Sequence, residues 1–315
     1  MKKKFLITFF VSFLCFTLLY STILKPLFEK KPTVTIPNVI DNENIEKEKE
    51  DELKVKNEIL FLLMGVDAED VKKSKGTRTD TMMLMKVNFD TGGISLLSIP
   101  RDTRVLVDGK LDKINHAHQN GGVELALNTV REFLGIDLEY YVKVDYKIVV
   151  DVVDAIGGVK INVPFDMKYK EYNPKVPPLN IDIKKGEQIL DGKNSHDFLR
   201  WRNNNAKTVG YKEGDIGRIK AQQYFMKELA KQTLKPKNLL RLPSLIETYF
   251  ENVETNIPIS IMLKGAISAN KIDVENMVTN TIPGEGKYIG EISYFVYDKE
   301  KMEVMVKDMF GSYIK

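Results

Sequence analysis

The feature that most constrains this chain is an uncharged apolar run near its N-terminus. Residues 5–24 contain no charged side chain, and Lys2, Lys3 and Lys4 come directly before them. At about 1.5 Å per residue, a helix of this length spans roughly 30 Å, the hydrocarbon thickness of a bilayer. The run therefore predicts a single transmembrane segment, and the folded part of the chain has to follow it.

Two interpretations of this run remain open, an uncleaved anchor and a cleaved signal peptide. A signal peptide usually has about 7–15 apolar residues followed by a small-residue cleavage site. Here the run is longer and continues into Lys25 and Pro26 without an Ala-x-Ala motif, which favours the anchor. The lysines before the run favour residues 1–4 staying in the cytoplasm. We therefore expect a single-pass protein of the cell membrane whose folded part is extracellular.

The segment after the apolar run, residues 25–57, is too polar to pack a core. Between positions 41 and 58 there are eight acidic and four basic side chains, and no aromatic residue occurs from 29 to 57. Such a composition is typical of a solvated linker. We expect a polar spacer that lifts a folded domain, residues 58–315, off the membrane. An acidic tail that binds a partner is the alternative.

Composition excludes several classes of function. The chain has 47 basic and 44 acidic residues, and its net charge of +3 is too balanced for a nucleic-acid-binding protein. Its single cysteine excludes an intramolecular disulfide framework and a cysteine-based zinc site. Hydrophobic residues make up 43% of the chain, so a large core can form.

Strand and helix patterns alternate along residues 58–315. Short apolar runs predict strands at 58–65, 81–88, 93–99, 140–144 and 159–163. Helical periodicity predicts helices at 122–134, 146–156 and 216–234. Turn residues at 90–93 predict an antiparallel hairpin of the second and third strands. The sequence therefore predicts one mixed-sheet α/β domain with α-β-α layers and no second boundary.

Arginine is rare in this chain and gathers in a few places. Only eight of the 47 basic residues are arginine. Six of the eight fall in three contexts, which contain Arg78, then Arg101 and Arg104, then Arg200, Arg202 and Arg218. The planar donor fork of arginine matches phosphate oxygens in pairs. The pattern favours an anionic ligand, and the alternative is structural ion pairing with Asp80, Asp102 and Asp215.

Acidic residues stand beside the same strand ends. Asp67 follows the first predicted strand, Asp80 precedes the second and Asp102 follows the third. The outer ends of the predicted hairpin should bring Asp80 and Asp102 together. Carboxylates that converge with arginines suggest a hard cation held against phosphate oxygens, for which Mg²⁺ is the first choice. The alternative is that each carboxylate caps a turn or pairs with an arginine.

These residues belong to a longer series of motifs. In order, the chain contains Gly65-Val-Asp67, Arg78-Thr-Asp-Thr81, Ser98-Ile-Pro-Arg-Asp-Thr103, Lys113-Ile-Asn-His-Ala117, Gly121-Gly122, Gly186-x-x-x-Leu190-Asp-Gly192, Arg200-x-Arg202, and Gly214-Asp-x-Gly-Arg218 with Gln222. Over residues 58–235 the chain resembles the LytR–CpsA–Psr family of membrane-anchored cell-wall glycopolymer transferases. Members of that family attach teichoic acids or capsular polysaccharides to peptidoglycan from a polyprenyl-pyrophosphate carrier.

The resemblance implies roles for individual residues. Mg²⁺, or Mn²⁺ in its place, is expected on Asp67 and Asp80. The pyrophosphate and the reacting groups are expected at Arg78, Arg101, Asp102, Arg104, Lys113, Arg200, Arg202, Arg218 and Gln222. Within that set we expect Arg101, Asp102, Arg200 and Arg202 to be catalytic, with Asp102 as the base. Thr79 stands where the family usually has serine, and residues 203–213 form a longer connection than is typical.

The resemblance also implies the partners, and it leaves two other functions open. The expected donor is a polyprenyl-pyrophosphate-linked glycan and the expected acceptor is peptidoglycan. The chain could instead bind such lipids without turnover and regulate the cell envelope, or it could hydrolyse them as a phosphatase. The apolar stretch 148–156 is core by default and a lipid pocket as the alternative. His116 and His118 have no third metal ligand nearby in the sequence, which favours a structural role.

Overall fold

A computed structural model describes residues 57–66, 71–74, 76–173, 179–239 and 253–315. The predicted anchor, nearly all of the predicted spacer and Asp67 lie outside the described residues. By internal contacts the chain divides into Met1–Val55 and Lys56–Lys315, and the second unit is the one described below. Within the described ranges, no helix is long and apolar enough to span a bilayer.

The centre of the fold is a six-stranded mixed sheet in the order β11-β6-β1-β2-β3-β12. Its strands are β1 (Glu58–Val66), β2 (Thr79–Asn88), β3 (Ile94–Ser98), β6 (Tyr140–Val144), β11 (Val253–Thr255) and β12 (Val278–Thr281). The β1–β2, β2–β3 and β11–β6 pairs are antiparallel, and the β1–β6 and β3–β12 pairs are parallel. The predicted mixed sheet and its central hairpin are therefore confirmed.

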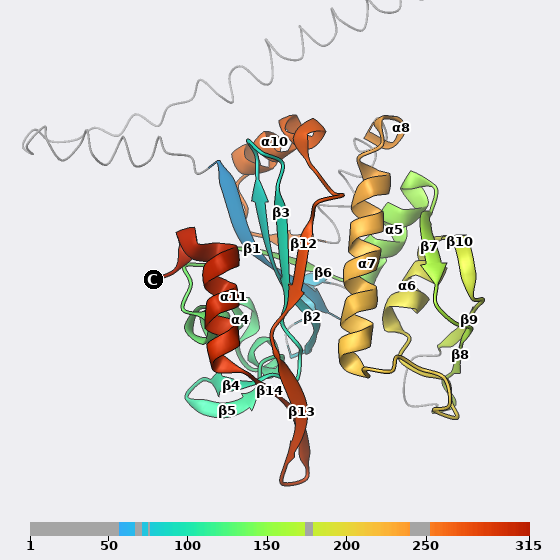
Figure 1. Cartoon of the computed structure of the whole chain (residues 1–315), viewed down its shortest axis with the longest axis horizontal. Helices are drawn as coiled ribbons and strands as arrows, with labels where there is room; N and C mark the ends of the chain where they lie inside the picture. Colours follow the sequence, from blue (N-terminus) through green and yellow to red (C-terminus); the bar gives the residue numbers. More distant parts are fainter. Residues whose placement is uncertain (1–56, 67–70, 75, 174–178, 240–252) are drawn as a thin grey trace, which may run out of the picture. The chain divides into compact units, whose positions relative to one another are not determined.

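Helices cover both faces of this sheet (Figure 1). The first face packs against α4 (His116–Leu134) and α11 (Lys299–Phe310) through a core that includes Leu62, Met64 and Leu127. On the other face lies α7 (Asp215–Thr233), whose Gln223 donates a hydrogen bond to Ser98 Oγ of β3 at 2.9 Å. Strand side chains alternate between faces, so one strand supplies both layers. The predicted α-β-α layering is confirmed.

A second hydrophobic core lies beside the sheet, around α7. It includes α5 (Tyr146–Ile156) and α6 (Gly192–Arg200), together with the pairs β7 (Val159–Val163)–β10 (Gly186–Leu190) and β8 (Met167–Lys170)–β9 (Asn180–Ile183). Its largest fully buried side chains are Trp201, Phe198 and Phe225. This core fixes the segment that carries Arg200 and Arg202, because Trp201 between them is anchored inside it.

The remaining elements are small. They are the hairpins β4 (Arg104–Val107)–β5 (Lys110–Lys113) and β13 (Gly284–Ile289)–β14 (Ile292–Tyr297), the helices α8 (Pro236–Leu239) and α10 (Ile259–Ile267), and 3₁₀ turns at Val71–Lys73, Ala269–Lys271 and Gly311–Tyr313. The predicted helix 122–134 extends back to His116 across a break at Gly121 and Gly122, whose backbone angles are not helical. Gly122 has φ +67°, a conformation that a side chain disfavours.

Candidate functional site

The outer ends of the β2–β3 hairpin meet, as their sequence predicted. The Arg101 guanidinium contacts Asp80 Oδ1 across the two ends. Asp102 follows, with Oδ2 4.0 Å from Arg101 Nε and Oδ1 2.9 Å from Lys113 Nζ of β5. All four side chains are partly exposed. A row of alternating charges therefore lines this edge of the sheet.

Three arginines gather next to that row, and their surroundings differ. Arg218 is 4% exposed, and its guanidinium lies 2.7 Å from Asp215 Oδ1 on the same helix. Within the described residues, no carboxylate lies within 4.0 Å of the Arg202 guanidinium. Crowding by protein, together with the charges of Arg218 and Arg101, lowers the pKa of Arg202 to about 10. Asp215 and Asp80 act on Arg202 only from beyond ion-pair distance, so Arg202, protonated at neutral pH, has no carboxylate in direct contact among the described residues.

Arg101 responds to its surroundings in the opposite sense. Partial burial disfavours its charge, but the carboxylate of Asp80 more than offsets this and raises the pKa of Arg101. The pair was the structural alternative in the sequence argument, and the structure contains it. It coexists with Arg202, which no described carboxylate contacts directly, so ion pairing does not account for all the arginines at this edge.

Two clefts meet at Arg202. One, of about 920 Å³, is lined by Asp80, Tyr146, Arg200 and Arg218 among others. The second, of about 1000 Å³, is lined by Arg101, Asp102 and Asp215 among others. The polar lining and the surplus of positive charge suit an anion such as a phosphate. We refer to the two together as the arginine cleft.

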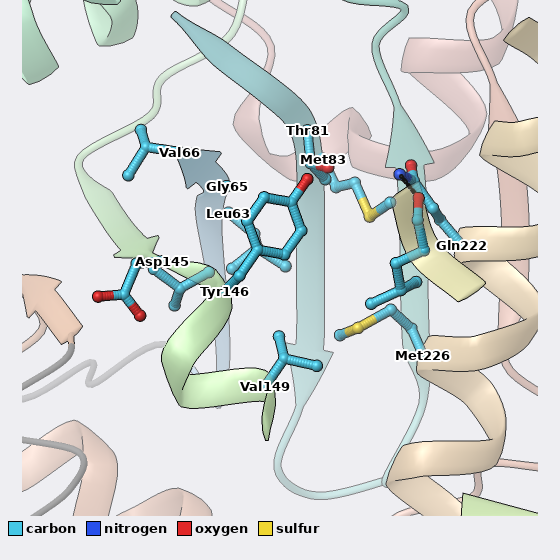
Figure 2. A pocket seen from close by; sticks show the side chains of 12 residues that line it. Leu63, Gly65, Val66, Thr81, Met83, Asp145, Tyr146, Val149, Gln222 and Met226 are labelled. Atoms are coloured by element: carbon cyan, nitrogen blue, oxygen red, sulfur yellow. Dashed lines mark hydrogen bonds between the residues drawn. The ribbon is translucent and has the colours of Figure 1, made fainter. Parts of the chain in front are cut away.

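A third cavity lies between the sheet and the helices α5 and α7 (Figure 2). Its walls are mostly apolar, with Leu63, Met83, Val149, Leu199 and Met226 among them. In Figure 2, Gln222 and Met226 project from α7 toward Tyr146 and Val149 of α5. The predicted segment 148–156 belongs mostly to the core, and the lipid-pocket alternative stays a prediction. Ile148, Val153 and Ile156 are buried, and Val149 lines the cavity.

Tyr146 joins the apolar cavity to the arginine cleft. It lines both spaces, and the Arg200 guanidinium lies 5.5 Å from the centre of its ring. The sequence analysis assigned no role to this residue. A signal did exist, because Gly65 lies at the carboxyl end of β1 and Tyr146 follows the carboxyl end of the parallel strand β6, where α/β sheets tend to bind ligands. The apolar cavity and the arginine cleft therefore lie next to each other at Tyr146.

The structure distributes the other predicted residues unevenly. Gln222 is buried, lines the apolar cavity and donates to the carbonyl of Leu199 at 3.3 Å. Arg78 is exposed and donates to Gln119 Oε1 at 2.9 Å. Arg104 lies over the ring of Tyr294. Arg78 and Arg104 are outside the lining of the arginine cleft, and their roles stay predictions.

The sequence predicts a bound Mg²⁺ at Asp67 and Asp80, and the structure describes only Asp80. Asp67 lies outside the described residues. Across the described part of the chain, no group of three or more His, Cys, Asp or Glu side chains could hold an ion. Magnesium commonly takes one or two carboxylates and completes its shell with substrate phosphates and water. Asp80, beside the arginine cleft, fits such a shared ligand set as one member.

The two histidines of the fourth motif have local partners. His116 Nδ1 lies 2.8 Å from the Asp112 carboxylate, and His118 Nδ1 donates to the carbonyl of Thr77 at 2.8 Å. Burial lowers the pKa of His118. These contacts place His118 in a structural role, in which it supports the loop that leads into Arg78 and Asp80.

Comparisons with known proteins identify relatives of this chain. A model of the LytR_cpsA_psr family matches residues 31–311. The chain is 28% identical over 312 residues to a Bacillus licheniformis protein named polyisoprenyl-teichoic acid–peptidoglycan teichoic acid transferase TagU, a match that covers 98% of this chain and 95% of that one. It is 32% identical over 260 residues to the Bacillus subtilis transferase of the same description named TagV, covering 79% of this chain and 63% of that one.

The crystal structure of B. subtilis TagV has the same fold. It superposes with a TM-score of 0.66 at 30% identity, over 81% of this chain and 97% of that chain. The mixed sheet and its flanking helices are therefore those of a structurally known group of proteins.

Proposed function

The chain belongs to the LytR_cpsA_psr family, and we propose that it transfers an anionic glycopolymer from a polyprenyl-pyrophosphate carrier to peptidoglycan. The observation that carries this proposal is the position of Tyr146, which lines both the apolar cavity and the arginine cleft. A lipid pyrophosphate has the matching polarity, an isoprenoid tail attached to a multiply charged headgroup. The names of the relatives supply the glycan, teichoic acid, and the acceptor, peptidoglycan.

The proposed reaction is a displacement at phosphorus. A sugar hydroxyl of the acceptor attacks the glycan-side phosphorus, the bond from that phosphorus to the bridging oxygen breaks, and polyprenyl phosphate leaves with the electron pair. A phosphodiester forms, and the hydroxyl proton passes to the Asp102 carboxylate, our candidate base. The protein itself forms no covalent bond in this reaction. Rate enhancement therefore comes from positioning the donor and the acceptor and from stabilising the developing charge.

The arginines of the cleft have different roles in binding the pyrophosphate. Arg202, which no carboxylate of the described residues contacts, binds the oxygens of the pyrophosphate directly. Arg218 is fixed by Asp215 and Arg101 by Asp80, so each presents its remaining donors in a set direction. The Nε–H groups of Arg101 and Arg218 are buried and have no partner in the described part of the chain. A bound phosphate would supply the acceptors that they lack.

We further propose that Mg²⁺ binds at Asp80, with Asp67 as the second carboxylate implied by the family resemblance. When bound, the ion would neutralise charge on the phosphate oxygens. We also propose that residues 5–24 anchor the protein in the cell membrane and that residues 25–57 are the spacer. An anchor suits the donor, because the lipid carrier remains in the same membrane while the domain acts on its headgroup.

The experiment that tests the function uses the full chain in detergent micelles, a synthetic polyprenyl-pyrophosphate disaccharide and a peptidoglycan fragment. Mass spectrometry should detect the glycan joined to the fragment by a phosphodiester, with free polyprenyl phosphate as the second product. Glycan phosphate in place of the joined product would indicate a phosphatase. Donor binding without products would indicate a non-catalytic protein.

Donor binding can be followed separately from turnover. Trp201 is the only tryptophan of the chain, is buried and lines the arginine cleft, so its fluorescence should report headgroup binding. Arg131→Lys provides a matched control for arginine substitutions. Its guanidinium bonds the carbonyl of Leu138 and the side chain of Asn128, away from both spaces.

A further inference from the structure

The β13–β14 hairpin reaches the candidate base from the C-terminal part of the chain. Within β14, the Phe295 amide donates to the backbone carbonyl of Asp102 at 2.9 Å, and Phe295 forms a parallel bridge with Thr103. Phe295 itself is buried in the main core. The hairpin lies at the lower edge of the domain in Figure 1. The strand β14 is therefore fixed to the segment that contains Asp102 and Thr103.

Next to Phe295, two cationic side chains lie over the ring of Tyr294. The Arg104 guanidinium carbon lies 5.6 Å from the ring centre and Lys113 Nζ lies 5.7 Å from it. Arg104 and Lys113 are directly opposite each other in the β4–β5 ladder. Like charges in directly opposed positions repel and destabilise a strand pair. The electron-rich face of an aromatic ring attracts both cations and offsets that repulsion.

One of these two cations is the partner of the candidate base. Lys113 Nζ lies 2.9 Å from Asp102 Oδ1. The contacts thus form a chain from Tyr294 to Lys113 to Asp102. A lysine ammonium on a flexible stem has several rotamers, and the ring narrows them to those that reach Asp102. Without the ring, repulsion from Arg104 would drive Lys113 away from the pair.

The position of this chain matches the acceptor side of the proposed reaction. Attacking and leaving oxygens lie roughly in line at the phosphorus. The leaving lipid belongs to the apolar cavity, which meets the arginine cleft at Tyr146, whereas Asp102 lines the part of the cleft without Tyr146. The acceptor hydroxyl therefore approaches from the side of Asp102, Lys113 and Tyr294.

We infer that Tyr294 is a positioning residue for the transfer reaction, which it serves by holding Lys113 against Asp102. This inference rests on the proposed function. It assigns a role to the C-terminal hairpin, which contributes no residue to the predicted site. The aromatic ring of Tyr294 performs this role and its hydroxyl does not, because Arg104 and Lys113 both contact the face of the ring.

The test compares Tyr294→Phe with Tyr294→Leu in the full chain. Tyr294→Phe keeps the ring and should retain kcat within about twofold. Tyr294→Leu loses both cation contacts and should lower kcat about tenfold. Donor affinity, measured by Trp201 fluorescence, should stay unchanged in both. Tyr288→Leu is the matched control, since Tyr288 is 78% exposed on the same hairpin, and it should behave as wild type.

A double-mutant cycle separates positioning from a general loss of structure. In a Lys113→Met background, Tyr294→Leu should cause no further loss, because the residue through which it acts is gone. Additive losses would overturn the inference, as would wild-type kcat in Tyr294→Leu or equal losses in the Phe and Leu variants. If the wild-type chain itself transfers no glycan, the proposed function fails instead, and these comparisons identify which of the two is wrong.

Discussion

Replacing Arg202 by glutamine should stabilise the ligand-free protein while it abolishes turnover. Crowding in the cleft and the charges of Arg218 and Arg101 lower the pKa of Arg202 from its ordinary value to about 10. Its charge is therefore disfavoured in the folded state at every pH below about 10, which includes neutral pH. The penalty fades only as the pH rises through that value.

The size of the effect follows from the pKa. One pKa unit corresponds to about 1.4 kcal/mol, which would give a penalty of roughly 3 kcal/mol in a fully buried site. The Arg202 side chain is exposed to solvent, and screening reduces the penalty to about 1 kcal/mol. For a domain of this size, removing an electrostatic penalty of about 1 kcal/mol should raise the Tm by about 2–4 °C. The same substitution removes a phosphate contact, which should lower kcat about 10²–10³-fold.

The assay pairs thermal melting with glycan transfer, and Arg218→Gln supplies the contrast. Arg218 is buried and bonded to Asp215, so its replacement leaves a carboxylate without its partner and should lower the Tm. Added inorganic pyrophosphate should raise the Tm of the wild type more than that of Arg202→Gln. A lower Tm in Arg202→Gln than in wild type, or a kcat near wild type, would refute the reasoning.

Three further predictions concern Arg101, Asp80 and His118. Arg101→Lys keeps the charge beside Asp80 but loses the planar donor fork, so kcat should fall about 10²-fold while Arg131→Lys stays near wild type in the same transfer assay. Asp80→Asn should abolish the stimulation of turnover by added Mg²⁺, and unchanged turnover of the wild type in EDTA would remove the metal from the proposal. Because burial lowers the pKa of His118, the folded protein should lose stability as the pH falls below about 6.5, where the unfolded chain takes up the proton. In His118→Asn, denaturant unfolding at several pH values should show a flatter dependence, and an unchanged slope would contradict the assignment.

The sequence was sufficient for the central layers because their signals are strong and local. Apolar runs bounded by turn residues identified β1, β2, β3 and β6, and glycine ended α5 as predicted, with Asp145 capping its start. The strand β13 lacked any such signal, because all of its residues are exposed and no apolar alternation marks it. The strand β11 has only three residues, too few for a period to show.

The candidate site divides in the same way. The meeting of Asp80 with Arg101 followed from a hairpin, which fixes which residues face each other. The contact of Tyr294 with Arg104 and Lys113 depends on two hairpins far apart in the sequence, and no local pattern specifies how they dock. The apolar cavity likewise required the packing of α5 and α7 over the sheet. Tyr146 and Tyr294, which only tertiary packing brings to the site, were the residues that the sequence did not reveal.

The charge balance of the arginine cleft bears on how the donor binds. Among Arg101, Arg202 and Arg218, two have carboxylate partners in the described structure and only Arg202 does not. A pyrophosphate diester carries more than one negative charge, so Arg202 alone cannot neutralise it. Besides Arg200 and Lys207, which also line the cleft, two sources of further positive charge lie at Asp80: a divalent cation bound there, or Arg101 after it leaves Asp80. Asp80→Asn frees Arg101 and removes the metal ligand at once. Arg101 as the source therefore predicts that this variant binds the donor without added Mg²⁺ while transferring no glycan, whereas weaker binding in the variant would identify the cation as the source.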